Sequence, residues 1–466
     1  MIDLGHLKGR KIAVMGLARS GLTAARALAA AGADVLAWDD GAAGRQAATE
    51  AGIALTDLHT ADLSGVTAVV LSPGIPHTFP APNPVAARAR AAGLPLISDI
   101  ELLRQAQPQA TYVGITGTNG KSTTTALTAH IIAGTGRPTQ VGGNLGIPAL
   151  SFDPLGADGF YVLEMSSYQL ELTPSLGFDA AVLLNITPDH LDRHGGMDGY
   201  IAAKKRIFQR GSATGTQVAV IGVDDPHSAR LADALEAGGF PGKLIRISAE
   251  APVAGGIGVQ NGILIDDRGG QHHTVTDLRT LPALPGRHNW QNAAAAYALA
   301  RAVGINHADI LDGLRTFPGL AHRQSRVADI GGIRFINDSK ATNADAAAKA
   351  LACYQPIYWI LGGRAKDTGL DGLDPFMPAV AHAFLIGEAS DAFAGWLSAR
   401  GVAHTRCGVM EDAVKAAFRQ ARTDGQTGAV VLLSPACASF DQYPNFEVRG
   451  DDFAAAVRRL SSGEIV

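Results

Sequence analysis

Short runs of β-branched and other apolar residues alternate with longer alanine- and leucine-rich segments along the whole chain. The apolar runs predict strands at Lys11–Met15, Ala68–Leu71, Tyr112–Thr116, Ala180–Asn185, Val218–Ile221, Tyr358–Leu361 and Val430–Leu433. Helical patterns lie between them, for example at Thr23–Ala31, Thr123–Ala133 and Asn292–Val303. This alternation predicts βαβ units, and therefore an α/β fold with mostly parallel sheets.

Three series of βα units follow one another, so we expect three domains. A chain of 466 residues is too long for one core, because domains average roughly 150 residues. We place the first domain at residues 1–100, the second at 101–319 and the third at 320–466. The first boundary lies beyond the proline-rich stretch Phe79–Pro84, and the second follows Phe317-Pro318-Gly319, a candidate hinge.

The composition is that of a folded protein from a reducing compartment. Hydrophobic residues make up 47% and charged residues 18% of the chain, which excludes a disordered chain. The formal net charge of -4 provides no overall basic field, so we expect no nucleic-acid partner. The three cysteines, Cys353, Cys407 and Cys437, are scattered and cannot all pair, which argues against a disulfide framework.

Neither a signal peptide nor a membrane span is predicted. The residues Met1–Lys8 lack the apolar core of a signal peptide, and no stretch reaches the roughly 20 apolar residues of a spanning helix. We therefore expect a cytoplasmic protein without stable membrane insertion, whose contact with any membrane-linked pathway is peripheral.

The strongest signal for chemistry is a glycine-rich segment between a predicted strand and a predicted helix. It reads Thr116-Gly117-Thr118-Asn119-Gly120-Lys121-Ser122-Thr123, and we call Gly117–Thr123 the phosphate loop. In such a loop, backbone N–H groups and the helix N-terminus face phosphate oxygens. Lys121 would neutralise the β- and γ-phosphates, and the Ser122 hydroxyl would bind Mg²⁺. The glycine spacing departs from the strict G-x-x-x-x-G-K-S/T pattern, and the alternative is a glycine-rich connector with an exposed lysine.

A second glycine loop, Gly16–Gly21, follows the first predicted strand and resembles G-x-G-x-x-G with Ala18 as the middle residue. Asp39 and Asp40 end the next strand about 20 residues further on, where an acidic residue often binds a ribose. The pattern is typical of a nucleotide diphosphate held at a helix N-terminus. A tight turn without a ligand explains it equally well, and both interpretations remain open.

Acidic and histidine residues after two other predicted strands form a candidate metal site. Glu164 ends one apolar strand, and Asp189 and His190 follow the run Ala180–Asn185. Loops after parallel strands line the ligand crevice of an α/β sheet, so these side chains would converge on the phosphate loop. Carboxylates suit Mg²⁺, whereas histidine is an unusual ligand for it. Taken singly, a helix cap or salt bridge explains each of them equally well, and Lys204 fits a solvated helix face.

Together and in this order, these segments resemble the Mur ligase superfamily over nearly the whole chain. The resemblance rests on Gly117–Thr123, Gly143-Asn144, Glu164–Leu170, Asp189–Arg193, Gly286–Asn292, His322-Arg323, Asn337–Asn343 and Ser434–Asp441. The last two segments are specific in combination, whereas the phosphate loop alone also fits folylpolyglutamate synthetases. Within the superfamily, the best match is the branch that adds D-glutamate.

The resemblance implies both a fold and a reaction. The fold is α/β, with a Rossmann-like N-terminal domain that binds UDP, a central P-loop-type ATPase domain, and a Rossmann-like C-terminal domain that closes on ATP and the amino acid. The reaction is the ATP-dependent addition of D-glutamate to the carboxylate of UDP-N-acetylmuramoyl-L-alanine through an acyl phosphate, in the cytoplasmic part of peptidoglycan biosynthesis. The implied ligands are ATP, Mg²⁺ at two sites and these two small-molecule substrates, and we expect a monomer.

The resemblance also assigns roles to individual residues. The UDP substrate would bind Leu17, Ala18, Arg19, Ser20, Gly21, Asp39, Ser72, Gly74 and Asn144. ATP would bind Gly117, Thr118, Asn119, Gly120, Lys121, Ser122, Thr123, Asn289, Asn292, Arg323, Asp338 and Lys340. The metal ligands would be Ser122, Glu164, His190 and a carbamylated Lys204, and the catalytic residues Lys121, His190 and Lys204. D-Glutamate would bind Thr342, Lys366, Ser439, Phe440 and Phe446. Asp40-Gly41 departs from the Thr-Arg that some relatives carry beside the uracil and phosphate.

Three alternatives remain. One is another ligase of the superfamily, which adds a different amino acid or lengthens folate. The second is an NAD(P)-dependent oxidoreductase built on Gly16–Gly21, which leaves Gly117–Thr123 unexplained. The third is a non-catalytic nucleotide-binding module, which is disfavoured because nucleotide, metal and acyl-site residues are all present.

Overall fold

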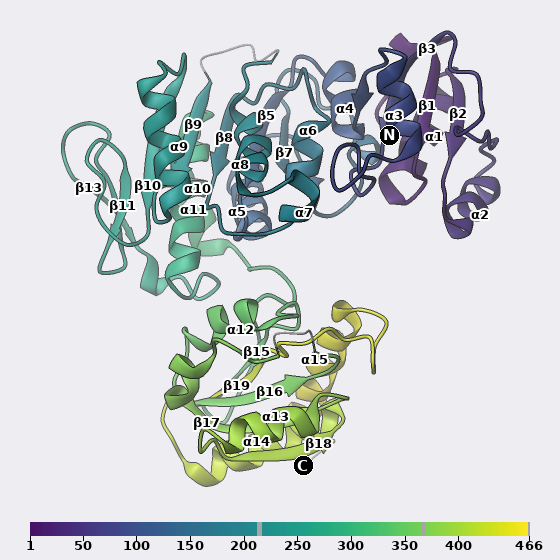
Figure 1. Ribbon diagram of the computed structural model, residues 1–466. Helices are drawn as coiled ribbons and strands as arrows, with labels where there is room; N and C mark the ends of the chain where they lie inside the picture. Colours follow the sequence, from purple (N-terminus) through teal and green to yellow (C-terminus); the bar gives the residue numbers. More distant parts are fainter. Residues whose placement is uncertain (212–216, 366–368, 465–466) are drawn as a thin grey trace. The chain divides into compact units, whose positions relative to one another are not determined.

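The computed structural model describes residues 1–211, 217–365 and 369–464 of the chain (Figure 1). These described residues form two compact units. The first unit comprises Met1–Leu278 and Asn289–Phe317, and the second comprises Arg279–His288 and the chain from Pro318 onward. The chain passes between the units after Leu278, after His288 and after Phe317, and the last of these points lies in the segment predicted as a hinge.

The N-terminal part of the first unit contains a parallel sheet with the strand order β2-β1-β3-β4. Its strands are β1 (Lys11–Met15), β2 (Asp34–Trp38), β3 (Val66–Leu71) and β4 (Leu96–Ile97). Its helices are the 3-10 helix η1 (Gly5–Leu7), α1 (Arg19–Ala30), α2 (Ala42–Glu50), α3 (Pro84–Ala91) and α4 (Asp99–Ala106). Loops after neighbouring parallel strands meet at one edge, so those after β1, β2 and β3 lie together.

The remainder of the first unit contains a larger mixed sheet, in the order β13-β12-β11-β10-β9-β8-β5-β7-β6. Its strands are β5 (Thr111–Thr116), β6 (Thr139–Gly143), β7 (Phe160–Glu164), β8 (Ala180–Leu183), β9 (Val218–Gly222), β10 (Lys243–Ser248), β11 (Ile257–Gln260), β12 (Ile263–Asp266) and β13 (His273–Asp277). The hairpins of β11, β12 and β13 are antiparallel, and the other pairs are parallel.

Most helices of this part lie between its parallel strands along the chain. The helices are α5 (Lys121–Gly134), η2 (Ala149–Ser151), α6 (Ser167–Glu171), α7 (Leu191–His194), α8 (Met197–Lys205), η3 (Arg206–Phe208), α9 (Pro226–Ala237), η4 (Leu278–Thr280), α10 (Arg287–Ala302) and α11 (His307–Thr316). The last three of them, η4, α10 and α11, follow β13. α5 packs against β7 and α11, and α6 packs against α8.

Strand β5 occupies the position from which the candidate site is built. It lies between β7 and β8, with Ile115 beside Glu164 and Thr116 beside Leu183. Its residues from Tyr112 to Thr116 are buried, as expected for a strand covered on both faces. A Cβ at Gly114 would lie 2.7 Å from the Phe178 ring, so this glycine serves the packing of β5 and is not part of the phosphate loop.

The second unit contains a sheet in the order β14-β15-β19-β16-β17-β18, in which only the β14–β15 pair is antiparallel among the strands described. The strands are β14 (Ser325–Ile330), β15 (Ile333–Asn337), β16 (Ile357–Gly362), β17 (Val380–Ile386), β18 (His404–Gly408) and β19 (Val430–Leu433). The helices are α12 (Ala344–Leu351), η5 (Asp374–Ala379), α13 (Ser390–Ser398), α14 (Met410–Asp424) and α15 (Phe446–Ser462).

Both faces of this second sheet are covered. Trp359 of β16 belongs to an apolar cluster with Phe393 of α13, whereas its neighbour Tyr358 belongs to another with Phe418 of α14. Successive residues of a strand point to opposite faces, so both faces need apolar side chains. This explains why the sequence of β16 is a continuous run of apolar residues.

The prediction of an α/β fold with mostly parallel sheets is confirmed, and the predicted elements differ from the observed ones mainly at their ends. α1 begins at Arg19 and α5 at Lys121, whereas the apolar pattern starts at Thr23 and Thr123. The first turns of these helices carry polar or small residues that face loops, so the hydrophobic pattern begins after the helix itself.

Strand β8 ends at Leu183, two residues before the predicted end. The backbone N–H of Leu184 donates to the Thr116 carbonyl at 3.0 Å, and the Asn185 carbonyl accepts from the Thr118 N–H at 2.9 Å. These residues therefore bind the backbone around the end of β5 instead of extending β8.

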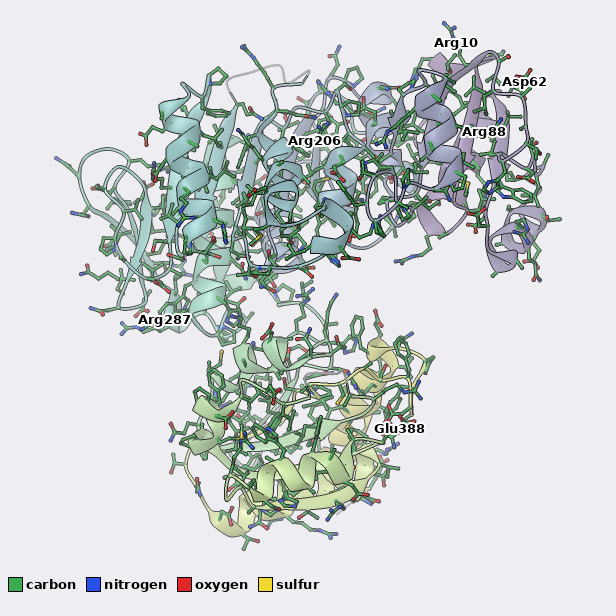
Figure 2. All side chains as sticks on the ribbon, viewed as in Figure 1. Arg10, Asp62, Arg88, Arg206, Arg287 and Glu388 are labelled. Atoms are coloured by element: carbon green, nitrogen blue, oxygen red, sulfur yellow. The ribbon has the colours of Figure 1, made fainter. Side chains whose placement is uncertain are left out.

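The charged side chains of Arg10, Asp62 and Glu388 lie exposed on the outside of their units (Figure 2). None of the helices described is long and apolar enough to cross a membrane.

We predict that Gly114→Ala lowers the free energy of unfolding by about 1–3 kcal/mol, because the added methyl group meets the Phe178 ring in a packed core. Gly134→Ala is the matched control, since nothing lies within 4 Å of a Cβ at the end of α5. Alanine at a helical position is neutral or stabilising by up to about 1 kcal/mol. Urea unfolding of both variants checks this, and equal effects would contradict it.

Candidate functional site

The phosphate loop connects β5 to α5 through two glycines with positive φ. Gly117 has φ of 156° and Gly120 has φ of 85°. A Cβ at Gly120 would lie 2.3 Å from Asn292 Oδ1, so no side chain fits there. Lys121 begins α5, and Ser122 and Thr123 follow in its first turn. The first N–H groups of a helix lack acceptors within the helix, and they form a ready anion site.

Two lysine side chains meet at the carbonyl oxygen of Gly117. Lys121 Nζ donates to it and to the Thr118 carbonyl, both at 2.9 Å. Lys204 Nζ, from α8, donates to the same Gly117 oxygen at 2.8 Å and lies 4.6 Å from the centre of the Tyr200 ring. The loop therefore concentrates positive charge where a phosphate would bind.

Lys204 is buried, with only 2% of its surface exposed, so the expectation of a solvated helix face is wrong. Desolvation lowers the pKa of the Lys204 amine well below its ordinary value, and repulsion from Lys121 lowers it further. The carboxylates of Asp189 and Glu164 act in the opposite direction. The neutral, nucleophilic form of this amine is therefore more accessible than that of a surface lysine.

Glu164, the last residue of β7, has a buried carboxylate whose two oxygens differ in their hydrogen bonding. Its Oε1 accepts from Asn144 Nδ2 at 2.8 Å, while Oε2 has no hydrogen-bond partner among the residues that the structure describes. The turn at Gly143 brings Asn144 here, since a Cβ at Gly143 would lie 2.3 Å from the Glu164 carbonyl. A buried carboxylate oxygen without a donor suits a hard cation such as Mg²⁺.

Ser122, the other predicted ligand of this ion, is buried in the first turn of α5. Nowhere in the described part of the chain do three or more His, Cys, Asp or Glu side chains form a metal-binding group.

His190 stands at the N-cap of α7 with a positive φ of 50°. Its Nε2 lies 3.5 Å from Asp189 Oδ2, and its ring centre lies 5.4 Å from that of Tyr168. The imidazole is 53% exposed, and it makes no capping hydrogen bond to the helix residues described. The helix-cap explanation for this side chain is therefore wrong.

Both predicted nucleotide asparagines of α10 lie behind the phosphate loop. Asn292 Oδ1 accepts from Thr124 Oγ1 at 3.1 Å, and its Nδ2 donates to Asn289 Oδ1 at 3.0 Å. Together with the tight approach of Asn292 to Gly120, these bonds fix α10 against the start of α5.

The sequence did not single out a chain of amides beside this loop. Asn185 Oδ1 accepts from the Asn119 N–H at 2.8 Å, and its Nδ2 donates to Gln291 Oε1 at 3.0 Å. Gln291 Nε2 in turn donates to Asp224 Oδ2 at 2.8 Å. Gln291 lies within the Gly286–Asn292 segment that carries the resemblance, whereas Asp224 has no such signal.

A cavity of about 380 Å³ opens at the carboxyl ends of β1, β2 and β3. It is lined by Met15, Gly16, Ala18, Arg19, Ser20, Asp39, Asp40, Ser72, Pro73, Gly74 and Ile75. Gly21 and Leu17 support the cavity: a Cβ at Gly21 would lie 1.8 Å from the Gly16 carbonyl, and the Leu17 N–H donates to Asp39 Oδ2 at 2.5 Å. Most residues predicted for UDP thus surround one cavity, whereas Asn144 lies beside Glu164.

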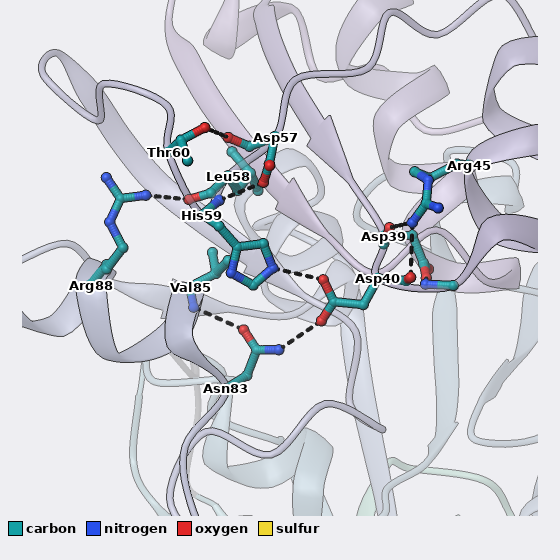
Figure 3. A network of polar contacts seen from close by, with 11 residues as sticks. Asp39, Asp40, Arg45, Asp57, Leu58, His59, Thr60, Asn83, Val85 and Arg88 are labelled. Atoms are coloured by element: carbon teal, nitrogen blue, oxygen red, sulfur yellow. Dashed lines mark hydrogen bonds and ion pairs between the residues drawn. The ribbon is translucent and has the colours of Figure 1, made fainter.

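At the rim of this cavity, Asp40 is held by neighbouring side chains (Figure 3). Its Oδ1 lies 2.8 Å from His59 Nε2, and its Oδ2 accepts from Asn83 Nδ2 at 3.1 Å. The hydrogen bond with His59 is the main reason why the pKa of Asp40 is below its ordinary value. Arg45 Nη1 donates to the backbone carbonyls of Asp39 and Asp40, each at 2.8 Å.

In the second unit, Asp338 lies where β15 and β19 end. Its Oδ2 accepts from Ser434 Oγ at 2.9 Å and its Oδ1 accepts from the Gln324 N–H at 3.2 Å. Burial raises the pKa of Asp338 to about 7, although both hydrogen bonds and the charge of Arg323 oppose that shift.

Lys340 and Phe446 lie beside this loop. Lys340 Nζ is 5.0 Å from the centre of the Phe446 ring, and Ser339 Oγ donates to the Phe446 carbonyl at 2.8 Å. The Thr342 N–H donates to the Lys340 carbonyl at 2.9 Å. The structure thus brings the start of α15 close to the residues that follow β15.

The remaining residues predicted for D-glutamate differ in exposure. Ser439 is buried, whereas Phe440 is 64% exposed. Lys366 lies outside the described residues. Arg449, which the sequence did not single out, is 1% exposed and donates from Nε to Ser339 Oγ at 3.0 Å. No local pattern marks it, because an arginine on an amphipathic helix normally faces solvent.

Comparison with family models gives two matches. The Mur ligase middle domain matches residues 115–300, and the Mur ligase glutamate ligase domain matches residues 322–437. A UDP-N-acetylmuramoylalanine–D-glutamate ligase of Paramagnetospirillum magneticum is 52% identical over 463 residues, which is 99% of this chain and 99% of the relative. An enzyme of the same name from Caulobacter vibrioides is 50% identical over 469 residues, 99% of this chain and 98% of the relative.

Solved structures share the fold at lower identity. UDP-N-acetylmuramate–alanine ligase MurC from Thermotoga maritima aligns with a TM-score of 0.57 and 18% identity, covering 97% of this chain and 99% of the other. MurF from Acinetobacter baumannii aligns with a TM-score of 0.57 and 20% identity, covering 76% of this chain and 79% of the other.

We predict that Asp338→Asn raises the free energy of unfolding at pH 8 by about 1–2 kcal/mol. A folded-state pKa of about 7, above the ordinary value of 3.8, means that the native state binds this proton more tightly than the unfolded state. The stabilising effect of that proton is complete below pH 4 and is lost as the pH rises through 7. The variant should therefore show less loss of stability between pH 5 and 8.

Urea unfolding at both pH values checks this, with Asp371→Asn in an exposed turn as the control. A variant that is less stable than the parent at pH 8 would contradict the expectation.

Proposed function

The chain belongs to the Mur ligase family, and from that premise we propose that it joins D-glutamate to the carboxylate of UDP-N-acetylmuramoyl-L-alanine at the expense of ATP. The relatives that carry the corresponding name are 50–52% identical over essentially the whole chain. We further propose that it acts as a monomer in the cytoplasmic part of peptidoglycan synthesis.

The observation that carries the proposal is the convergence of Lys121, Glu164 and Lys204 at the carboxyl ends of β5 and β7. The two amines share the Gly117 carbonyl, and the carboxylate supplies an unpaired oxygen beside them. A triphosphate and a divalent cation together satisfy both features. An oxidoreductase that used only the cavity after β1 would leave all three groups without a role.

We assign the UDP part of the substrate to residues 1–100, where the cavity after β1, β2 and β3 lies. ATP is assigned to residues 101–319, with Asn289 and Asn292 beside the phosphate loop. D-Glutamate is assigned to residues 320–466, through Thr342, Lys366, Ser439, Phe440 and Phe446. This last segment also supplies Arg323, Asp338 and Lys340 to ATP.

The reaction requires that a carboxylate be made electrophilic. A carboxylate oxygen of the UDP substrate attacks the γ-phosphorus of ATP, and ADP leaves. The neutral amine of D-glutamate then attacks the acyl carbon, inorganic phosphate leaves, and the nitrogen loses one proton as the amide forms. Both partners of the first step are anions, so Lys121 and the start of α5 would stabilise the charge that accumulates between them.

The oxygen ligands around Glu164 fit Mg²⁺, which when bound would screen the repulsion between ATP and the substrate carboxylate. We propose that Ser122 and Glu164 hold one ion. His190 and a carbamylated Lys204 would hold a second.

A carbamate at Lys204 has a clear physical basis. The neutral Nζ attacks the carbon of CO₂, the new nitrogen–carbon bond forms, and one proton leaves to solvent. Burial favours the neutral amine that this step needs. The product is an anion, which attracts cations where an ammonium would repel them.

The function is tested by phosphate release with UDP-N-acetylmuramoyl-L-alanine as acceptor. We expect ATP-dependent release that requires D-glutamate, with kcat/KM lower by at least about tenfold for L-glutamate, L-lysine and diaminopimelate. A folate acceptor should give no release. Preference for another amino acid would overturn the substrate assignment, and a lack of any release would overturn the ligase assignment.

We predict that Lys204→Ala abolishes most of the activity and that added formate or acetate restores part of it, because a small carboxylate can replace the missing carbamate. Lys205→Ala is the matched control, since this neighbouring lysine is exposed. It should retain near-parental kcat. If Lys204→Ala is folded and shows no rescue at any carboxylate concentration, the carbamate assignment is wrong.

A further inference from the structure

The two sheets of the first unit are joined by contacts that the proposed chemistry does not use. On one side is the loop after β3, residues 72–79, which we call the β3 loop. Its residues Ser72 to Ile75 line the cavity assigned to UDP. On the other side is the segment 189–195, which contains α7 and starts beside the phosphate loop. The junction therefore lies between the two proposed ligand sites.

Arg193 makes the most direct link across this junction. Its Nη1 donates to the carbonyl of Gly74 at 3.0 Å, and Gly74 itself lines the cavity. Its guanidinium carbon lies 4.6 Å from the centre of the Tyr168 ring, and its own N–H donates to the His190 carbonyl at 3.0 Å. One residue thus connects the cavity wall with the backbone of a proposed metal ligand.

A second contact reinforces the link. Gly195 has φ of 69°, and a Cβ there would lie 2.8 Å from the Phe79 ring. Phe79 is nevertheless 48% exposed, so its ring covers the end of α7 at the surface. The two ends of the β3 loop are therefore each in contact with the α7 segment.

A charged cluster lies under the same junction. Glu171 of α6 lies 3.6 Å from His77 Nε2 and 3.6 Å from His194 Nδ1 through its two carboxylate oxygens. His194 Nε2 lies 2.9 Å from Ser167 Oγ, at the start of α6. α6 follows Glu164 directly along the chain, so the junction also reaches the second proposed metal ligand.

We propose that Arg193 is a positioning residue that couples occupancy of the UDP cavity to the affinity of the metal site. The proposal rests on the proposed function, because it assumes that UDP and the metal bind where that function places them. A ligand that fixes Gly74 also fixes the acceptor of Arg193, and Arg193 in turn restrains the backbone of His190. Coupling of this kind is reciprocal, so each ligand must tighten the binding of the other.

The experiment measures metal binding and requires no turnover. Mn²⁺ is titrated into the protein with a non-hydrolysable ATP analogue, and free Mn²⁺ is followed by its electron paramagnetic resonance signal, with and without saturating UDP. UDP lacks the muramoyl carboxylate, so it cannot ligate the metal site by that group. Its diphosphate and the ATP analogue also bind Mn²⁺ in solution, so a protein-free titration with the same nucleotides is subtracted, and the remaining effect of UDP is the one that passes through the protein. We expect UDP to lower the apparent Mn²⁺ dissociation constant by about fivefold in the parent.

Arg193→Ala should reduce this factor to below about twofold, while the Mn²⁺ dissociation constant without UDP changes little. Arg206→Ala is the matched control: Arg206 is partly buried and donates from Nε to the Leu170 carbonyl at 2.9 Å, but it is not part of the junction (Figure 2). It should keep the parental factor. Phe79→Ala, at a position that is 48% exposed, should lower the UDP effect in part, and it tests the coupling if Arg193→Ala fails to fold.

Two other outcomes would contradict the proposed coupling. An Arg193→Ala protein that keeps the fivefold effect shows that Arg193 serves only local structure. A parent without any effect of UDP on Mn²⁺ overturns the coupling itself. Failure of the proposed function is recognised separately, because it appears as a lack of D-glutamate-dependent phosphate release in the parent.

Discussion

The carbonyl oxygen of Gly117 accepts hydrogen bonds from two lysine side chains, and this shared acceptor brings α5 and α8 together at the end of β5. Lys121 comes from the helix after β5, and Lys204 comes from α8, more than eighty residues later. Two buried amines this close repel one another when both are protonated, which favours the neutral form of Lys204 and the presence of anions nearby. The unpaired oxygen of Glu164 supplies one of them, and a triphosphate would supply the others.

Each of the two units also contains buried charged groups that are costly to fold. Lys204, Glu164 and Asp338 are all buried, and each departs from the surface position that a charged residue prefers. An unpaired buried charge costs several kcal/mol, which the protein reduces by shifting the pKa or by providing hydrogen bonds. Asp338 shows both responses, since its pKa rises to about 7 while Ser434 and Gln324 donate to it. Retention of such groups is a sign of function.

Strand order explains how residues far apart in the sequence reach one place. β5 lies between β7 and β8, so the loops after all three strands open at the same edge. In the N-terminal sheet, the loops after β1, β2 and β3 likewise open at one edge and line the cavity. The β3 loop then extends from the cavity wall to α7. Gly74 and Arg193 meet there across 119 residues of chain. The cavity on one sheet and the loops of the other sheet are in this way linked by the Arg193 side chain.

Much of the fold could be predicted from the sequence, because local patterns of apolar residues and glycines specify its strands and turns. The apolar runs located β1 and β19 correctly to the residue, and the position of Gly120 marked a turn that only glycine can make. The order of the motifs also indicated the family and the phosphate loop. The predicted ends of α1, α5 and β8 were less accurate, because polar residues at these ends face loops and extend no apolar pattern.

The burial of Lys204, the raised pKa of Asp338 and the bond from Arg193 to Gly74 were decided only by the tertiary structure. In the sequence, nothing local distinguishes Lys204 and Arg193 from charged residues that face solvent on a helix. Whether such a side chain meets water, a carbonyl oxygen or another charge depends on which distant strand or loop packs against it. The sequence by itself therefore determined the elements and their order, whereas packing between distant segments decided the charges and contacts that give the site its chemistry.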